Sequence, residues 1–240
     1  MPTRRAVLTT AAASAVASLA LARPAAAQAH SAYAMCYFKE SPDMTDDGYA
    51  LHPEVSDDGL DWAPLNQNRP VATPTAGTGG LRDPFLARKR DGTFAVLATD
   101  LKGRVFNLAN QYIHVWDSTD LTSFTGYRRV RLPDMNTHSW APPAFWDPSR
   151  GEYGVVYSAH NGVRDVLMVN YTTDFVDMGA PRLYFDPGFN VLDGDVLVHD
   201  GVFYLAYKNM DDGNVYVARS STGAANSFTT LTRGLRRGDA

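Results

Sequence analysis

Two stretches of the chain combine carboxylates with a constrained backbone. Asp83 lies between Arg82 and Pro84, at the beginning of a short apolar run. A residue before proline is held out of the helical region, so we expect a stiff, extended backbone at Asp83. Asp193 and Asp195 are two residues apart, which places both side chains on one face of a strand. Two carboxylates that meet at one opening supply the base and the acid that hydrolysis of a glycosidic bond requires.

Each of these carboxylates also has a purely structural interpretation. Asp83 beside a proline and Asp193 before Gly194 both fit ordinary turns with solvated acids. Arg82 either keeps Asp83 ionised through its positive charge or pairs with another acid at a strand edge. Asp195 offers Asp193 a like charge, which would keep one of the two protonated, as a general acid needs. The choice depends on where the strands place these residues.

A third stretch, residues 138–145, carries groups that suit sugar binding. Trp140 offers a flat apolar face on which a sugar ring can stack. His138 either helps to hold a sugar or a channel ion, or is a packed histidine with no ligand. The frequent aromatic residues, glycines and prolines of the chain suit both sugar binding and a fold with many turns.

The elements that must position these residues follow a repeat. Each unit pairs an aromatic-rich strand, which we interpret as the inner strand, with a strand that ends in Ser or Thr, one further residue and usually Asp. The units comprise residues 33–38 with 55–62, 93–97 with 112–124, 152–157 with 167–175, and 202–207 with 215–221. The interval of roughly fifty to sixty residues is close to that of propeller blades.

The repeat predicts an all-β fold, because strands alternate with short polar turns and no helical periodicity is present. A β-propeller explains four units in one order, and a β-sandwich with similar turns is the alternative. In a propeller the innermost strands line a central channel and begin at one mouth. Residues 82–84, 138–145 and 191–196 precede the aromatic strands of their units by about ten residues. We therefore expect Asp83 and Asp193 to face the same opening.

Residues 1–29 are interpreted as an export signal and not as part of the fold. Arg4 and Arg5 form a twin-arginine pattern, an apolar run follows from Ala11 to Leu21, and small residues at 25–29 offer cleavage sites. The arginine pair predicts secretion by the twin-arginine (Tat) route, and an ordinary Sec signal is the alternative. No later apolar run is long enough to cross a membrane. Residues 30–240 are expected to form one propeller domain.

The composition argues against several other functions. The formal net charge is −4 and no basic stripe is present, so nucleic acid is not an expected partner. Cys36 is the only cysteine, which excludes an intrachain disulfide and a cysteine-based metal cluster. The six histidines show no zinc-ligand spacing. We expect a monomer that needs no cofactor and has an oligo- or polysaccharide as its partner.

These motifs together resemble glycoside hydrolase family 43, whose members are five-bladed β-propellers that cleave arabinofuranosides and xylosides. The matching stretches are residues 37–38, 56–62, 65–66, 81–85 and 140–142, position 193, position 204 and residues 207–208. The resemblance implies inverting hydrolysis, with Asp83 as the base that activates water and Asp193 as the acid that protonates the leaving oxygen. Within the matching stretches, Arg82 and Trp140 are expected to shape the sugar pocket. His138 and Asp195, which lie beside matching positions, are further candidates for substrate binding. It assigns no metal ligand, and a structural calcium ion is an open expectation.

The chain departs from the pattern of that family in two places. The family has an acidic residue directly after Trp-Ala-Pro, where this chain has Pro143. About four blades are recognised before Ala240, so the last blade of the five-bladed type is expected to be incomplete. Both departures favour an alternative, a carbohydrate-binding propeller whose catalysis is impaired. Fructoside-cleaving relatives also carry Arg-Asp-Pro, which leaves a fructosidase as a further alternative.

Overall fold

The computed structural model describes residues 32–41 and 47–235, and these residues form strands joined by turns. The export signal predicted for residues 1–29 lies outside them. The helical element of the described part is one short 3-10 turn, η1 (Asn66–Asn68). Within the described ranges no helix is both long and apolar enough to cross a membrane. The expectation of an all-β fold is therefore confirmed.

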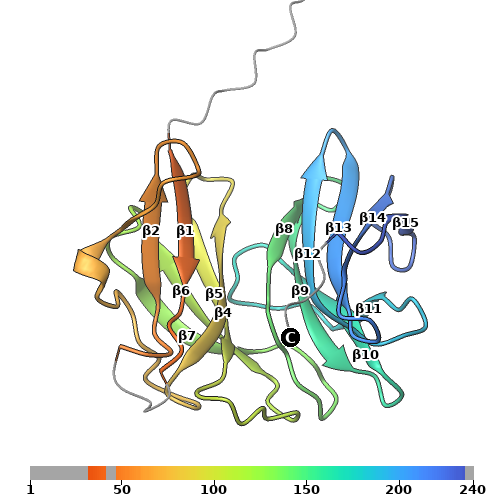
Figure 1. Ribbon diagram of the computed structural model, residues 1–240, viewed down its shortest axis with the longest axis horizontal. Helices are drawn as coiled ribbons and strands as arrows, with labels where there is room; N and C mark the ends of the chain where they lie inside the picture. The colour runs from red at the N-terminus through yellow and green to blue at the C-terminus, as the bar shows by residue number, and fades with distance from the viewer. Residues whose placement is uncertain (1–31, 42–46, 236–240) are drawn as a thin grey trace, which may run out of the picture. The chain divides into compact units, whose positions relative to one another are not determined.

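Four antiparallel sheets follow one another along the chain, and strands that are neighbours in sequence are neighbours in each sheet (Figure 1). The first contains β1 (Tyr33–Tyr37), β2 (His52–Ser56) and β3 (Ala63–Pro64). The second contains β4 (Leu81–Arg88), β5 (Phe94–Asp100), β6 (Tyr112–Ser118) and β7 (Thr125–Arg131). The third contains β8 (Ala144–Asp147), β9 (Glu152–His160), β10 (Asp165–Thr172) and β11 (Arg182–Phe185). The fourth contains β12 (Val191–His199), β13 (Val202–Asn209), β14 (Val215–Ser220) and β15 (Thr229–Thr232).

The first strands of successive sheets lie next to one another. β1 contacts β4, β4 contacts β8, and β8 contacts β12. This is the arrangement of four propeller blades and not of the two layers of a sandwich. The described residues hold four blades, so the five-bladed type stays a prediction.

The order of strands within a blade corrects one expectation. We interpreted the aromatic runs at 93–97, 152–157 and 202–207 as inner strands, but they form the second strands β5, β9 and β13. The innermost strands are β4, β8 and β12, the segments that carry or directly follow the candidate site residues. β5 and β9 are apolar because both of their faces are buried between neighbouring blades, whereas in β13 only alternate residues are buried. In the first blade the turn motif follows β2, whereas in the other blades it follows the third strand, β6, β10 or β14. Strands β1 and β2 of the three-stranded first sheet therefore correspond to the second and third strands of the other sheets.

The turn that ends these four strands has one geometry throughout. In the third blade the Thr172 hydroxyl accepts hydrogen bonds from the backbone amides of Asp174 (3.3 Å) and Phe175 (3.0 Å). The Asp174 carboxylate then accepts from the amide of Val176 at 2.8 Å. The residue three places after the hydroxyl has positive φ in every blade, at Gly59 (76°), Leu121 (61°), Phe175 (61°) and Gly223 (64°). The repeat seen in the sequence is thus a repeated side-chain-capped turn.

The buried apolar residues form three clusters, and each lies between two consecutive sheets. Leu51, Leu81 and Trp116 join the first and second sheets, where the half-buried Cys36 also packs. The second cluster joins β5 and β6 to β9 and β10, and the third joins β9 and β10 to β12 and β13. Burial raises the pKa of the Cys36 thiol to about 12, so this cysteine behaves as a small apolar side chain. The core of this fold is therefore the set of contacts between blades.

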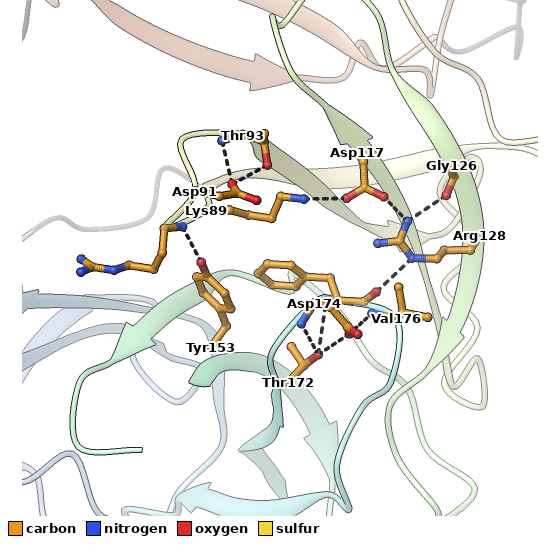
Figure 2. Close-up of polar contacts among 12 residues, drawn as sticks. Lys89, Asp91, Thr93, Asp117, Gly126, Arg128, Tyr153, Thr172, Asp174 and Val176 are labelled. Carbon is orange, nitrogen blue, oxygen red and sulfur yellow. Dashed lines mark hydrogen bonds and ion pairs between the residues drawn. The ribbon is translucent and has the colours of Figure 1, made fainter. Parts of the chain in front are cut away.

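Polar contacts close the seam between the second and third blades (Figure 2). The Arg128 guanidinium binds the Asp117 carboxylate at 2.6 Å within its own blade and donates to the Phe175 carbonyl of the next blade at 3.0 Å. Lys89 binds the second oxygen of Asp117 at 3.2 Å. The backbone amide of Arg90 donates to the Tyr153 hydroxyl at 2.6 Å, and the Tyr153 ring stacks on Phe175. The bonds from Arg128 to Phe175 and from Arg90 to Tyr153 thus join the two blades, and the contacts within each blade hold the groups that form them.

We predict that Tyr153→Phe lowers the free energy of unfolding by about 1–2 kcal/mol, because the Arg90 amide loses its acceptor at a buried position while the ring packing is kept. Urea denaturation followed by tryptophan fluorescence measures the change. Tyr33→Phe is the matched control, since Tyr33 is exposed and should change stability by less than about 0.5 kcal/mol. Equal effects of the two substitutions would contradict a role for this bond in joining the blades.

Candidate active site

Two adjoining cavities open where the innermost strands begin. The larger has a volume of about 550 Å³ and is lined by Arg82, Asp83, Leu101, Phe106, Leu108, Trp140, Leu192, Asp193, Lys208 and Met210. The smaller, of about 190 Å³, is lined by Asp83, Pro84, Phe85, Ala141, Pro143, Asp193, Gly194 and Asp195. Asp83 and Asp193 belong to both. The structure thus brings together the two carboxylates that the sequence singles out, at the opening where the propeller interpretation expects them.

Three equivalent positions in three blades share an unusual backbone. Asp83 in β4, Ala141 just before β8 and Asp193 in β12 have φ of 48°, 46° and 54°. The pairing register also shifts at this point in β4 and in β12, as in a β-bulge. The expectation of an extended backbone at Asp83 is therefore wrong, because the bulge imposes the left-handed region in spite of Pro84. Such strained residues persist only where the surroundings hold them, and they are frequent at functional sites.

Hydroxyl groups of the preceding blade hold two of these bulges. The amide of Ala141 donates to the Thr99 hydroxyl at 2.8 Å, and the amide of Asp193 donates to the Ser158 hydroxyl at 3.0 Å. Thr99 and Ser158 are buried and occupy the same position of their blades, since Thr99 pairs with Arg82 and Ser158 with Trp140. In the fourth blade the residue at this position is Lys208, which pairs with Leu192.

The close approach of the third and fourth blades requires a glycine beside Asp193. A Cβ atom added to Gly194 would lie 2.2 Å from the Leu167 side chain of the third blade. The second and third blades have prolines at this point, Pro84 and Pro142. Gly194 is therefore explained by packing, and the interpretation of Asp193–Gly194 as a solvated loop turn is replaced by a position inside β12.

The environment of Asp83 both opposes and favours its charge. Desolvation by the surrounding walls raises its pKa, and the nearby carboxylates of Asp193 and Glu40 act in the same direction. The Thr99 hydroxyl, which donates to Asp83 Oδ2 at 3.1 Å, and the Arg82 guanidinium lower it. The net pKa lies above its ordinary value. Asp83 is therefore a partly desolvated carboxylate with one hydroxyl donor fixed on it.

The environment of Asp193 corrects our expectation about Asp195. Desolvation raises the pKa of Asp193, and the ammonium group of Lys208 lowers it; Asp195 does not contribute. The bulge separates the two side chains, so that Asp195 lines only the smaller cavity. Asp195 is solvent-exposed, and partial desolvation by its surroundings raises its pKa. The charge that acts on Asp193 is therefore that of Lys208, whereas Asp83 is affected by Asp193, Arg82 and Glu40.

Arg82 has a different partner from the one that we considered first. Its guanidinium forms an ion pair with Glu40 at 2.7 Å and donates to the Gly103 carbonyl at 3.2 Å. Its charged group also lies over the rings of Phe38 (4.9 Å) and Phe106 (5.5 Å). The interpretation of Arg82 as the partner of another acid is therefore confirmed by its contact with Glu40. Arg82 also lowers the pKa of Asp83, but through the electrostatic effect of its charge and not through a direct bond. These contacts fix Arg82 as part of the wall of the larger cavity.

Trp140 and His138 belong to different cavities. The Trp140 ring lines the larger cavity and contacts Phe106, with ring centroids 5.5 Å apart. His138 stacks on Trp140 at 4.0 Å, is buried, and makes no hydrogen bond through its ring nitrogens to the described residues. Desolvation lowers its pKa to about 4, so the ring is neutral near pH 7. Its geometry suits the positioning of Trp140, and direct binding of a sugar by His138 stays a prediction.

The third blade lacks a carboxylate at this opening. Its bulge position is Ala141, and Pro143 lines the smaller cavity where the family 43 pattern has an acid. Glu40 is near Asp83, but its two oxygens are bound by Arg82 and by Arg104, which donates from Nε at 3.0 Å. Among the described residues no group of three or more His, Cys, Asp or Glu side chains is arranged to hold a metal ion. Calcium binding stays an expectation.

Several residues of the site were missed in the sequence analysis. Thr99 and Ser158 accept hydrogen bonds from the bulges of the following blade. Their role depends on how the second strand of one blade is aligned with the first strand of the next, and no spacing in the sequence reveals that alignment. Lys208 lies in a stretch that matches family 43, but a lone lysine in an aromatic strand gives no further signal. Glu40 and Phe106 come from loops that the strand pattern does not place. The ion pair between Glu40 and Arg82 joins the first blade to the second.

The comparison with known families identifies the chain. A family model described as "Probable glycosyl hydrolase domain", related to glycoside hydrolase family 43, matches residues 28–239. The chain belongs to this family. The match includes all four blades and both candidate carboxylates, so the resemblance predicted from the motifs is confirmed, and the family supports a hydrolase.

Individual relatives agree with this assignment. The chain is 30% identical to an α-L-arabinofuranosidase of Bifidobacterium longum, over 62% of this chain and 17% of the relative. An exo-β-1,3-galactanase of Clostridium thermocellum has a TM-score of 0.66 at 14% identity, over 86% of this chain and 47% of that one. A xylan β-1,4-xylosidase of Bacillus halodurans has a TM-score of 0.62 at 16% identity, over 85% and 40%. These two structures share the fold, and the chain spans less than half of each of the three relatives.

We predict that Thr99→Val raises the pKa of Asp83, because the hydroxyl that stabilises its ionised form is lost. The same change should lower the free energy of unfolding by about 1–3 kcal/mol, since the Ala141 amide loses its acceptor. NMR titration of the Asp83 carboxyl carbon and urea denaturation measure the two effects. Thr99→Ser keeps the hydroxyl and is the control; an unchanged Asp83 titration in Thr99→Val would contradict the assigned contact.

Proposed function

We propose that the protein is a secreted glycoside hydrolase that cleaves arabinose- or xylose-containing plant saccharides by inverting hydrolysis. The observation that carries the proposal is the convergence of Asp83 and Asp193, from two blades, on one cavity with an aromatic wall. Family membership supports a hydrolase. The proposed sugars follow the resemblance found in the sequence, and the names of two relatives, an arabinofuranosidase and a xylosidase, agree with them. We also propose export by the Tat route and a propeller of the five-bladed type, of which this chain holds about four blades.

The proposed reaction divides two proton transfers between the carboxylates. Asp83 accepts a proton from water, whose oxygen attacks the anomeric carbon as the glycosidic C–O bond breaks. Asp193 gives its proton to the departing oxygen. The Thr99 hydroxyl favours the ionised form of Asp83, as a base needs. Desolvation favours the protonated form of Asp193, as an acid needs. The sugar product then has the opposite anomeric configuration, which NMR of the first product observes directly.

A carbohydrate-binding protein with impaired catalysis is the second candidate. It is favoured by Ala141 and Pro143, which leave the third blade without a carboxylate at the opening. The same cavity, with Trp140 and Phe106 on its wall, would then bind a saccharide without cleaving it. Assay on 4-nitrophenyl α-L-arabinofuranoside, 4-nitrophenyl β-D-xyloside and sucrose, with binding to arabinan and xylan, separates hydrolase, fructosidase and binding protein. Binding without turnover on any substrate selects the second candidate.

We predict that Asp83→Asn and Asp193→Asn each lower kcat/KM by at least about a hundredfold, because each removes a group that transfers a proton in the transition state. Steady-state kinetics on the preferred aryl glycoside, with circular dichroism as a check of folding, tests this. Asp195→Asn is the matched control at the same opening and should retain activity within about tenfold. Activity within about tenfold of the parent in Asp83→Asn, about 1.4 kcal/mol, would refute its role as the base.

We predict that Lys208→Met moves the basic limb of the pH profile of kcat/KM to higher pH. The Lys208 cation lowers the pKa of Asp193, so its removal raises that pKa and the acid stays protonated to higher pH. Lys208→Arg keeps the charge and should leave the limb in place. A limb that does not move, or that moves to lower pH, would show that Asp193 is not the acid.

A further inference from the structure

A third cavity lies beside the larger one and has nearly the same volume. It measures about 540 Å³ and is lined by Asn107, Leu108, Ala109, Asn136, Thr137, His138, His160 and Asp165. These residues come from the loops β5–β6 and β7–β8 and from the end of β9 and the start of β10. In antiparallel meanders these points lie at the same end of the sheets as the start of β4, β8 and β12. The cavity therefore opens on the face that carries the candidate carboxylates.

The lining of this cavity selects a neutral, hydroxyl-rich ligand. It contains amides, a hydroxyl, imidazoles and one carboxylate, and neither Lys nor Arg. Asp165 would repel an anion, and no cation in the lining would compensate. The described residues hold no cluster suited to a metal ion. Amides and a carboxylate are, in contrast, good partners for sugar hydroxyls, which both donate and accept hydrogen bonds.

Several polar atoms in the lining of the third cavity have no hydrogen-bond partner among the described residues. The His160 Nδ1 accepts from the Gly162 amide at 3.1 Å, which leaves Nε2 for a ligand. The Thr137 hydroxyl accepts from the His160 amide at 2.7 Å. The Asp165 carboxylate lies 3.9 Å from the His138 Nε2, which is beyond hydrogen-bond distance. Asn136 is exposed and its amide makes no hydrogen bond with the described residues.

The third cavity adjoins the larger cavity, and the two share a wall. Leu108 lines both. The stacked rings of Trp140 and His138, 4.0 Å apart, form a partition with Trp140 on one side and His138 on the other. Leu108 is thus the point at which a ligand bound at Asp83 and Asp193 lies nearest to the lining of the third cavity.

We propose that this third cavity is a binding subsite for the sugar units that adjoin the cleaved one, so that the substrate is an oligo- or polysaccharide chain. Asn136, His160 and Asp165 bind its hydroxyl groups. This inference rests on the proposed function of the larger cavity and extends it to a stretch of the substrate remote from the reacting bond.

The test compares a short and a long substrate in the full chain. The double variant Asn136→Ala/Asp165→Ala should keep kcat/KM on the 4-nitrophenyl glycosides within about twofold and lower kcat/KM on α-1,5-arabinotriose or β-1,4-xylotriose roughly tenfold, as the loss of two hydrogen bonds implies. Asp57→Ala is the charge-matched control, because Asp57 is exposed in the turn after β2, at the opposite end of the sheets. Equal effects on both substrates, or no effect on either, would overturn the proposal.

Calorimetric binding separates this proposal from the proposed function. If the parent protein cleaves no substrate but binds a trisaccharide, and the double variant binds it roughly tenfold more weakly, the subsite stands and hydrolysis fails. If the parent protein cleaves aryl glycosides and the variant binds trisaccharide as well as the parent does, hydrolysis stands and the subsite is refuted. A parent protein that neither cleaves nor binds any of these saccharides would refute both.

Discussion

The hydrogen bond from a strained backbone amide to a hydroxyl of the preceding blade is the constraint on which the site depends. Thr99 holds the third blade in this way at Ala141, and Ser158 holds the fourth at Asp193. A left-handed residue other than glycine costs free energy, and a buried acceptor at the right place offsets that cost. Thr99 also donates to Asp83. One side chain thus connects a candidate catalytic group to the backbone of the neighbouring blade.

The electrostatics of the opening depend on which charged side chains are already bound to other protein groups. The Arg82 guanidinium is bound by the Glu40 carboxylate and the Gly103 carbonyl. It lies between the rings of Phe38 and Phe106 and forms part of the cavity wall. Lys208 occupies the position that carries a hydroxyl in the two preceding blades, and its influence falls on Asp193. Partial desolvation raises the pKa of both aspartates, of which Asp83 is half-buried and Asp193 is exposed at the opening. A carboxylate pair with raised pKa values and one adjacent ammonium group is suited to proton transfer near neutral pH.

The sequence predicts the fold class, the repeat and the convergence of Asp83 with Asp193, because all three depend on local patterns that recur at regular intervals. The sequence misplaces the inner strands, since the aromatic runs belong to the second strand of each blade and not to the strand that begins at the opening. It also fails at the bulges, where Pro84 suggests an extended Asp83 but the sheet imposes positive φ. Thr99, Ser158 and Lys208 escape because their function depends on pairing register between strands, which a single sequence does not reveal. The pairing of Arg82 with Glu40 joins two blades, and contacts of this kind have no local signature.

The three apolar clusters have a consequence for how the molecule unfolds. None of them lies inside one sheet, and each needs the faces of two. A single sheet removed from its neighbours would expose its apolar faces and lose most of its burial, so it has little stability of its own. Fragments cut between sheets should therefore aggregate, and loss of one seam should melt the neighbouring ones within a single cooperative transition.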